Sequence, residues 1–212
     1  TPQRKLWPDF LLAIKHEIAP ALGCTEPISL ALASAIAARH LGSAPDRIDA
    51  KVSANLMKNG MGVNVPGTGM VGLPIAAAVG ALGGDPDGGL EVLKGLSEKT
   101  ISAGKAMLAE QRVMVGVADV PHILYSEARL VHGSDWVRVC IADAHTNVIL
   151  IEKNGEILFK ANPCYGERGQ SYSLSEATAH GVYDFATTAP FADIAFILEA
   201  ARLNSQLSKE GL

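Results

Sequence analysis

One stretch near the amino terminus limits the architectures open to this chain. Residues 28–41 are rich in alanine and apolar on nearly every helical face, and Gly42 ends the pattern. Thr25 can cap this helix, and Pro27 is tolerated in its first turn. Because a helix that is apolar all round must be covered on all sides, we expect the rest of the chain to pack around this segment.

The rest of the first half predicts further helices. Apolar residues at helical spacing predict a helix over 8–19, a buried helix over 73–82, and one broken helix or a pair of helices over 88–110. Between them we expect a strand over 46–55 and an ordered, glycine-punctuated loop over 56–72.

Beyond Gln111 the spacing changes from helical to strand-like. Short segments rich in β-branched and aromatic residues, separated by turn residues, lie at 113–115, 123–131, 136–141, 148–152 and 157–160. Helical spacing then returns over 175–185 and 190–207. Helices, then strands, then helices predict an α+β fold, with buried alanine-rich helices and a mainly antiparallel meander in the second half. A subdivision into a helical part over 1–110 and a meander with carboxy-terminal helices over 111–212 is possible.

Charge and hydropathy exclude some classes of partner. The formal net charge of -4 gives no broad attraction for nucleic-acid phosphates or anionic lipid, so we expect neither nucleic acid nor a membrane as a partner. The longest nearly uncharged stretch, 70–84, is shorter than the roughly 20 residues of a spanning helix. No secretory signal is visible, and three widely spaced cysteines do not suggest a disulfide framework or a complete zinc site. We expect a cytoplasmic protein.

Cys24 is the first candidate for chemistry. It stands between Gly23 and Thr25, at the predicted start of the long apolar helix. Unpaired N–H groups at a helix amino terminus favour an anion, which lowers a thiol pKa from its usual value of about 8.5 and supplies a thiolate nucleophile, base or metal ligand. Glu26 opposes this effect, because a nearby carboxylate disfavours a second negative charge. The alternative is a small buried side chain at a tight turn.

A glycine-rich segment over 60–72 is the second candidate. It contains a formal G-x-G-x-x-G at Gly67, Gly69 and Gly72, but Pro66 stands where the strand of a dinucleotide-binding fingerprint would end. Dinucleotide binding is therefore disfavoured. The glycine amides could instead bind a carboxylate or phosphate, or the segment could serve packing alone.

Two polar groups could assist such a site. Lys58-Asn59 would place a cation and an amide beside the glycine-rich segment, suited to an amino acid's carboxylate. His145-Thr146-Asn147 falls in a connection between predicted strands. Both groups could equally be solvated loop residues. Of the other thiols, Cys164 is a weaker loop candidate and Cys140 is expected in the core, while no G-x-S-x-G elbow supports a serine hydrolase.

Three motifs together closely resemble the L-cysteine desulfidase family, which is related to the iron-sulfur L-serine dehydratases. They are PALGCTEP at 20–27, NLMKNG at 55–60 followed by VPGTGMVGLP at 65–74, and HTN at 145–147. The resemblance runs over nearly all of the chain and implies the amino-terminal half of a lyase that works without pyridoxal phosphate. Such a lyase eliminates hydrogen sulfide from L-cysteine in cysteine catabolism, leaving pyruvate and ammonia. The alternatives are an L-serine dehydratase-like deaminase and a non-catalytic amino-acid-binding module.

The resemblance also implies roles for particular residues. Cys24 would be the base that takes the substrate α-proton. Substrate contacts would come from Thr25, Glu26, Lys58, Asn59, Gly67, Thr68, Gly69, His145, Thr146 and Asn147. In the family a 4Fe-4S cluster acts as Lewis acid on the leaving group.

The family's cluster cysteines lie in a carboxy-terminal half that this sequence lacks, so we expect no metal on this chain. We therefore expect a truncated piece, a proteolytic product or one subunit of a split enzyme, inactive alone. Its partners would be the missing half or a complementary subunit and a small amino acid such as L-cysteine or L-serine. Assembly with further copies into a homo-oligomer is left open by the sequence.

Overall fold

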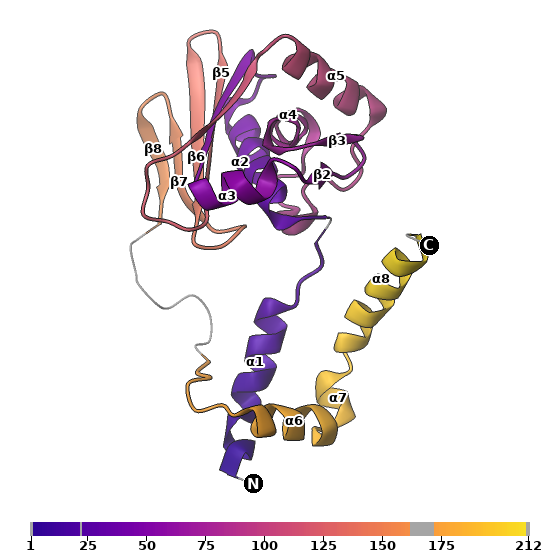
Figure 1. Ribbon diagram of the computed structural model, residues 1–212. Helices are drawn as coiled ribbons and strands as arrows, with labels where there is room; N and C mark the ends of the chain where they lie inside the picture. Colours follow the sequence, from indigo (N-terminus) through magenta and orange to yellow (C-terminus); the bar gives the residue numbers. More distant parts are fainter. Residues whose placement is uncertain (1, 22, 162–171, 211–212) are drawn as a thin grey trace. The chain divides into compact units, whose positions relative to one another are not determined.

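A computed structural model describes residues 2–21, 23–161 and 172–210 of the 212-residue chain (Figure 1). Two compact units are present. The larger is Ala21–Pro163, and the smaller joins Thr1–Pro20 to Cys164–Leu212. The mixture of helices with a largely antiparallel sheet is the α+β fold that the sequence predicts. Cys164, the weaker thiol candidate, lies outside the described residues.

Helix α2 (Thr25–Leu41) forms the centre of the larger unit, as predicted. Its residues from Pro27 to Ala37 are buried, and it packs along helix α4 (Leu73–Gly83). Gly80 permits this close packing, because a Cβ atom there would overlap the carbonyl oxygen of Ala31. Gly42 adopts a φ of 77° and ends the helix, which only glycine does readily.

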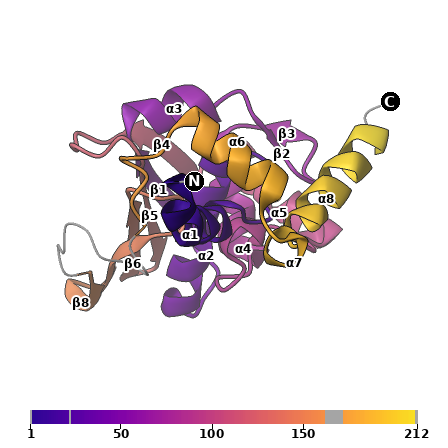
Figure 2. The ribbon, with the colours of Figure 1, turned by 90° about the horizontal axis from the view of Figure 1, so that it is seen from below.

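A six-stranded sheet lies against α2, with strand order β4-β1-β5-β6-β7-β8. The strands are β1 (Arg47–Val52), β4 (Val113–Val117), β5 (Tyr125–His132), β6 (Asp135–Ala142), β7 (Val148–Lys153) and β8 (Glu156–Lys160). Strands β5 to β8 form the predicted antiparallel meander, and β1 is inserted between β4 and β5, parallel to the first and antiparallel to the second. Figures 1 and 2 both show α2, α4 and α5 (Glu98–Ala109) on one side of this sheet.

The segment after β1 contains a helix and a hairpin where the sequence predicts an ordered loop. Strand β1 ends at Val52, and helix α3 (Ala54–Gly60) follows, capped by the Ser53 hydroxyl, which accepts from the Leu56 N–H at 3.3 Å. A small hairpin of β2 (Asn64–Val65) and β3 (Met70–Val71) comes next. The predicted strand over 46–55 is present as β1 but ends earlier, at Val52, and the predicted loop over 56–72 contains most of α3 and the hairpin. A helix as short as α3 shows no clear period in the sequence.

The smaller unit is built from short helices around a small core. They are η1 (Pro2–Leu6), α1 (Trp7–Glu17), α6 (Ala179–Thr188), α7 (Phe191–Ile194) and α8 (Ile197–Glu210). Leu6, Phe10 and Phe185 form its buried hydrophobic cluster within the described ranges. Helix α6 begins four residues later than predicted, where the Thr178 hydroxyl caps it. In the larger unit, η2 (Gly89–Glu91) precedes α5. Across the described residues no helix is both long and apolar enough to cross a membrane.

Candidate functional site

Cys24 lies directly before the first residue of α2 and is itself the N-cap residue. Gly23 before it has a φ of 85°, a conformation that favours glycine. A Cβ atom on Gly23 would lie 2.8 Å from Pro66 Cγ, so this turn packs against the glycine-rich segment. The predicted position of Cys24 at the helix start is confirmed, whereas Thr25 begins the helix and does not cap it.

The Cys24 thiol donates a hydrogen bond to a carboxylate two residues ahead. Cys24 Sγ lies 2.8 Å from Glu26 Oε2. Thr25 Oγ1 lies 3.5 Å from the same oxygen, and Asn59 Nδ2, from the last turn of α3, donates to Glu26 Oε1 at 3.5 Å. Two motifs that are separate in the sequence therefore meet at one carboxylate.

This pairing sets the protonation states of the two groups. Burial, followed by the hydrogen bond to Glu26, raises the pKa of the Cys24 thiol. A helix terminus alone predicts the opposite direction. The hydrogen bond from Cys24 lowers the pKa of Glu26. Near neutral pH the pair is accordingly a thiol and a carboxylate.

The loop between β6 and β7 brings one residue of the third motif, His145, within electrostatic reach of Glu26. Burial lowers the pKa of His145 and outweighs the opposing influence of the Glu26 charge, so the imidazole is neutral near pH 7. Within the described part of the chain, His145 Nε2 and Asn147 Oδ1 are buried without a hydrogen-bond partner. Asn147 Nδ2 donates to the Ala142 carbonyl at 2.8 Å, which fixes the side chain. These two atoms therefore lack the hydrogen bond whose loss typically costs about 1–3 kcal/mol.

The glycine-rich segment forms the turn between β2 and β3. Gly67 and Gly69 have φ values of 75° and 64°, and nothing lies within 4 Å of the Cβ position of either. The buried Thr68 hydroxyl donates to the Val65 carbonyl at 2.7 Å and accepts from the Met70 N–H at 3.0 Å. The Thr68 side chain thus supports the turn and is not free for a substrate.

The surroundings of this turn do not match a dinucleotide-binding fingerprint. Strand β2 has two residues and pairs antiparallel with β3, whereas the fingerprint needs a parallel βαβ unit. Of the other predicted contacts, Lys58 and Thr146 are exposed, and neither hydrogen-bonds to Glu26 among the described residues. The sequence therefore named several residues that the structure does not bring to the thiol.

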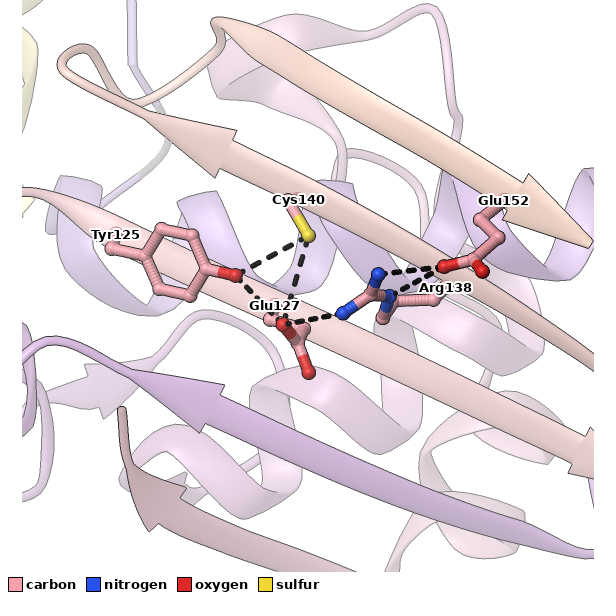
Figure 3. Close-up of polar contacts among 5 residues, drawn as sticks. All are labelled: Tyr125, Glu127, Arg138, Cys140 and Glu152. Carbon is pink, nitrogen blue, oxygen red and sulfur yellow. Dashed lines mark hydrogen bonds and ion pairs between the residues drawn. The ribbon is translucent and has the colours of Figure 1, made fainter. Parts of the chain in front are cut away.

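A second polar cluster, which sequence reasoning missed, lies on the sheet face opposite α2 (Figure 3). Tyr125 Oη donates to Glu127 Oε2 at 2.7 Å and lies 3.3 Å from Cys140 Sγ. Arg138 pairs with Glu127 at 3.7 Å and with Glu152 at 2.6 Å. Burial raises the pKa of Cys140 to about 11, so this thiol stays protonated. Cys140 is buried as predicted, but only the strand register reveals its polar neighbours.

Residues that could hold a metal ion do not gather in this part of the molecule. No group of three or more His, Cys, Asp or Glu side chains suited to a metal occurs among the described residues. The described residues therefore do not fit a 4Fe-4S cluster.

Comparison with known proteins gives close relatives and no matching family model. The chain is 64% identical over 208 residues to a UPF0597 protein of Chromobacterium violaceum, covering 98% of this chain and 48% of that protein. It is 54% identical over 213 residues to a UPF0597 protein of Dichelobacter nodosus, covering 100% and 49%. It is 49% identical over 211 residues to the UPF0597 protein YhaM of Escherichia coli, covering 98% and 48%.

These relatives correct the family assignment drawn from motifs. Three short motifs resemble the L-cysteine desulfidases, but proteins that match nearly every part of the chain carry a different family name, so that assignment is wrong. Short motifs around a thiol and a glycine turn reflect only local similarity, whereas identity over 208 residues reflects similarity of nearly the whole sequence. The chain spans about half the length of the curated relatives it matches. Over nearly its whole length, the chain is thus similar to one half of the UPF0597 proteins.

Proposed function

We propose that the chain supplies the proton-abstracting part of a lyase that acts on a small α-amino acid with a leaving group on its β-carbon. L-Cysteine is the first candidate substrate and L-serine the second. The observation that carries the proposal is the 2.8 Å contact between the Cys24 thiol and the Glu26 carboxylate, with Asn59 on the same carboxylate and the charge of Glu26 acting on His145. The name of the UPF0597 relatives gives no activity, so the support comes from this geometry.

In the proposed reaction Cys24 acts as a thiolate and takes the α-proton of the substrate. The bond between the β-carbon and sulfur of L-cysteine breaks, and its electron pair leaves with the sulfur as hydrosulfide. The 2-aminoacrylate left behind tautomerises to an imine, which water hydrolyses to pyruvate and ammonia. A Lewis acid that assists the leaving group, such as a 4Fe-4S cluster, would have to be held by residues other than those described.

Charge and hydrogen-bonding groups around Cys24 suit the zwitterion of an amino acid. Glu26 is ionised and can pair with the α-ammonium group. The peptide N–H groups of Gly67 and Gly69 donate no backbone hydrogen bond to the described residues and suit a carboxylate. The contact between Gly23 and Pro66 holds that turn beside Cys24.

The test is product release by a chimera in which this chain replaces the matching half of the Chromobacterium violaceum relative. We expect the chimera, assayed without oxygen, to release pyruvate and sulfide from L-cysteine. Cys24→Ala should lower kcat by at least about 100-fold, because a general base typically contributes this much or more.

Cys140→Ala is the matched control, since it removes a thiol outside the site, and its kcat should stay within about twofold of the parent. Full turnover by Cys24→Ala would show that Cys24 is not the base. A chimera that binds L-cysteine and releases neither product would favour the amino-acid-binding module.

A further inference from the structure

The proposed base is held in the form that cannot act. Glu26 Oε2 accepts the hydrogen bond of the Cys24 thiol, and this bond stabilises the protonated sulfur. A thiol is a poor base, so a site that uses Cys24 needs something that displaces this hydrogen bond when a substrate arrives.

Among the described residues, the groups facing Cys24 leave one full charge in the site. On α2 this charge is Glu26. From α3 comes the neutral amide of Asn59, and from the β6–β7 loop the neutral imidazole of His145. Lys58, next to Asn59, is exposed to solvent. The site is therefore negative near neutral pH and is matched to a compact cation with several donors, which describes a primary ammonium group.

Glu26 is also able to exchange its partners. Two of its three hydrogen bonds, from Thr25 and Asn59, are long at 3.5 Å, so the 2.8 Å bond from Cys24 is its one short contact in the described structure. An ammonium group is a charged donor and forms a stronger bond to a carboxylate than a neutral thiol does. Competition between the two donors should favour the ammonium group.

We propose that Glu26 keeps Cys24 protonated until the α-ammonium group of an amino acid pairs with Glu26 and displaces the thiol. Without ligand, Glu26 holds the thiol. When the ammonium group pairs with Glu26, the S–H group of Cys24 loses its acceptor and the added positive charge stabilises the thiolate. The thiol then ionises more readily, and its proton passes to solvent through the partly exposed side chain. The inference rests on the proposed function for the purpose of the thiolate, but not for the binding step itself.

The ligand class follows from this chemistry. A small α-amino acid releases the thiolate whether or not it carries a leaving group, so L-alanine should act as well as L-serine. A 2-hydroxy acid such as L-lactate has the same carboxylate and no ammonium group, so it should leave Cys24 as a thiol. The Cys24–Glu26 hydrogen bond thus makes activation of the thiol depend on an amino acid, before any bond to carbon is broken.

The experiment follows the ultraviolet absorbance of the Cys24 thiolate, taken as the difference between the unmodified chain and Cys24→Ser. The midpoint is obtained from the rise of the curve between about pH 7 and 9, where L-alanine keeps its α-ammonium group. Subtraction removes Cys140 and the tyrosines. L-Alanine should lower the midpoint by about one pH unit, as a new cation near a thiol does. L-Lactate should leave it unchanged. Glu26→Gln should lower the midpoint without any ligand and abolish the response to L-alanine.

Glu98→Gln is the matched control, since Glu98 also lies in the first turn of a helix, in α5, and it should keep the full response to L-alanine. An unchanged midpoint with L-alanine, or an equal shift in Glu26→Gln, would overturn the inference. Failure of the lyase proposal is a separate result, because the absorbance is read with an amino acid that has no leaving group. A shift with L-alanine in a chimera that releases no pyruvate would support the role of Glu26 and contradict the lyase proposal.

Discussion

The two described cysteines lie in opposite chemical settings although both thiols are protonated at neutral pH. Cys24 is partly exposed at a helix start and contacts one carboxylate, whereas Cys140 is 2% exposed and lies between Tyr125 and Glu127. Sequence reasoning identified Cys24 and its neighbours Glu26 and Asn59 from motifs. It did not predict the direction of the Cys24 pKa shift, because that depends on where the Glu26 side chain points.

Alkylation rates should separate the two thiols. Both pKa values are raised, so less thiolate is present at pH 8 than in a free cysteine, and a pKa of about 11 leaves Cys140 with about a hundredth or less of the thiolate of an ordinary thiol. We expect iodoacetamide at pH 8 to label Cys24 more slowly than denatured protein, and Cys140 far more slowly still. Peptide mass spectrometry measures both rates in one sample, and faster labelling of Cys140 than of Cys24 would contradict the assignment.

At the scale of helices and strands, long regular segments were predictable and short or long-range features were not. The apolar helix α2 and the meander of β5 to β8 follow from local period and turn residues. Helix α3 was missed because seven residues show little periodicity. The insertion of β1 between β4 and β5 was missed because pairing partners such as Ile48 and Val113 are far apart in the sequence.

The packing of α2 on α4 should depend on Gly80. In Gly80→Ala the new methyl group meets the backbone of Ala31, which cannot rotate away as a side chain would, so the helices must separate. We expect a loss of about 1–3 kcal/mol in the free energy of unfolding, measured by urea denaturation. Gly116→Ala in β4, where nothing lies within 4 Å of the added atom, should change stability by less than about 0.5 kcal/mol. Equal effects of the two substitutions would refute this account of the contact.

At the scale of the whole molecule, the units do not follow the order of the chain. The smaller one combines the first 20 residues with the segment from Cys164, while the larger one is continuous. Local patterns cannot predict this union, since nothing in the spacing of α1 indicates that its Phe10 contacts Phe185 of α6. That contact has ring centroids 5.4 Å apart, and Trp7 meets the same ring at 5.6 Å.

Phe185→Ala should loosen both segments of the smaller unit together. Loss of a buried phenylalanine typically costs about 3–5 kcal/mol, which is large for a core of three buried residues. Hydrogen exchange should then accelerate in 7–17 as well as in 179–188, while α2 and the sheet stay protected. Exposed Tyr183→Ala on the same helix is the control and should leave α1 unaffected. Faster exchange confined to α6 would show that the two segments do not depend on one another.

The place of β1 in the sheet also bears on synthesis of the protein at the ribosome. Its partners β4 and β5 end at residues 117 and 132, so β1 has neither neighbour until the chain has been made that far. During that interval α2, which is apolar on nearly every face, lacks the strands that later cover it. Until residue 132 has been made, the nascent chain should therefore expose an apolar helix that is prone to aggregate. A molecular chaperone is most needed during that interval.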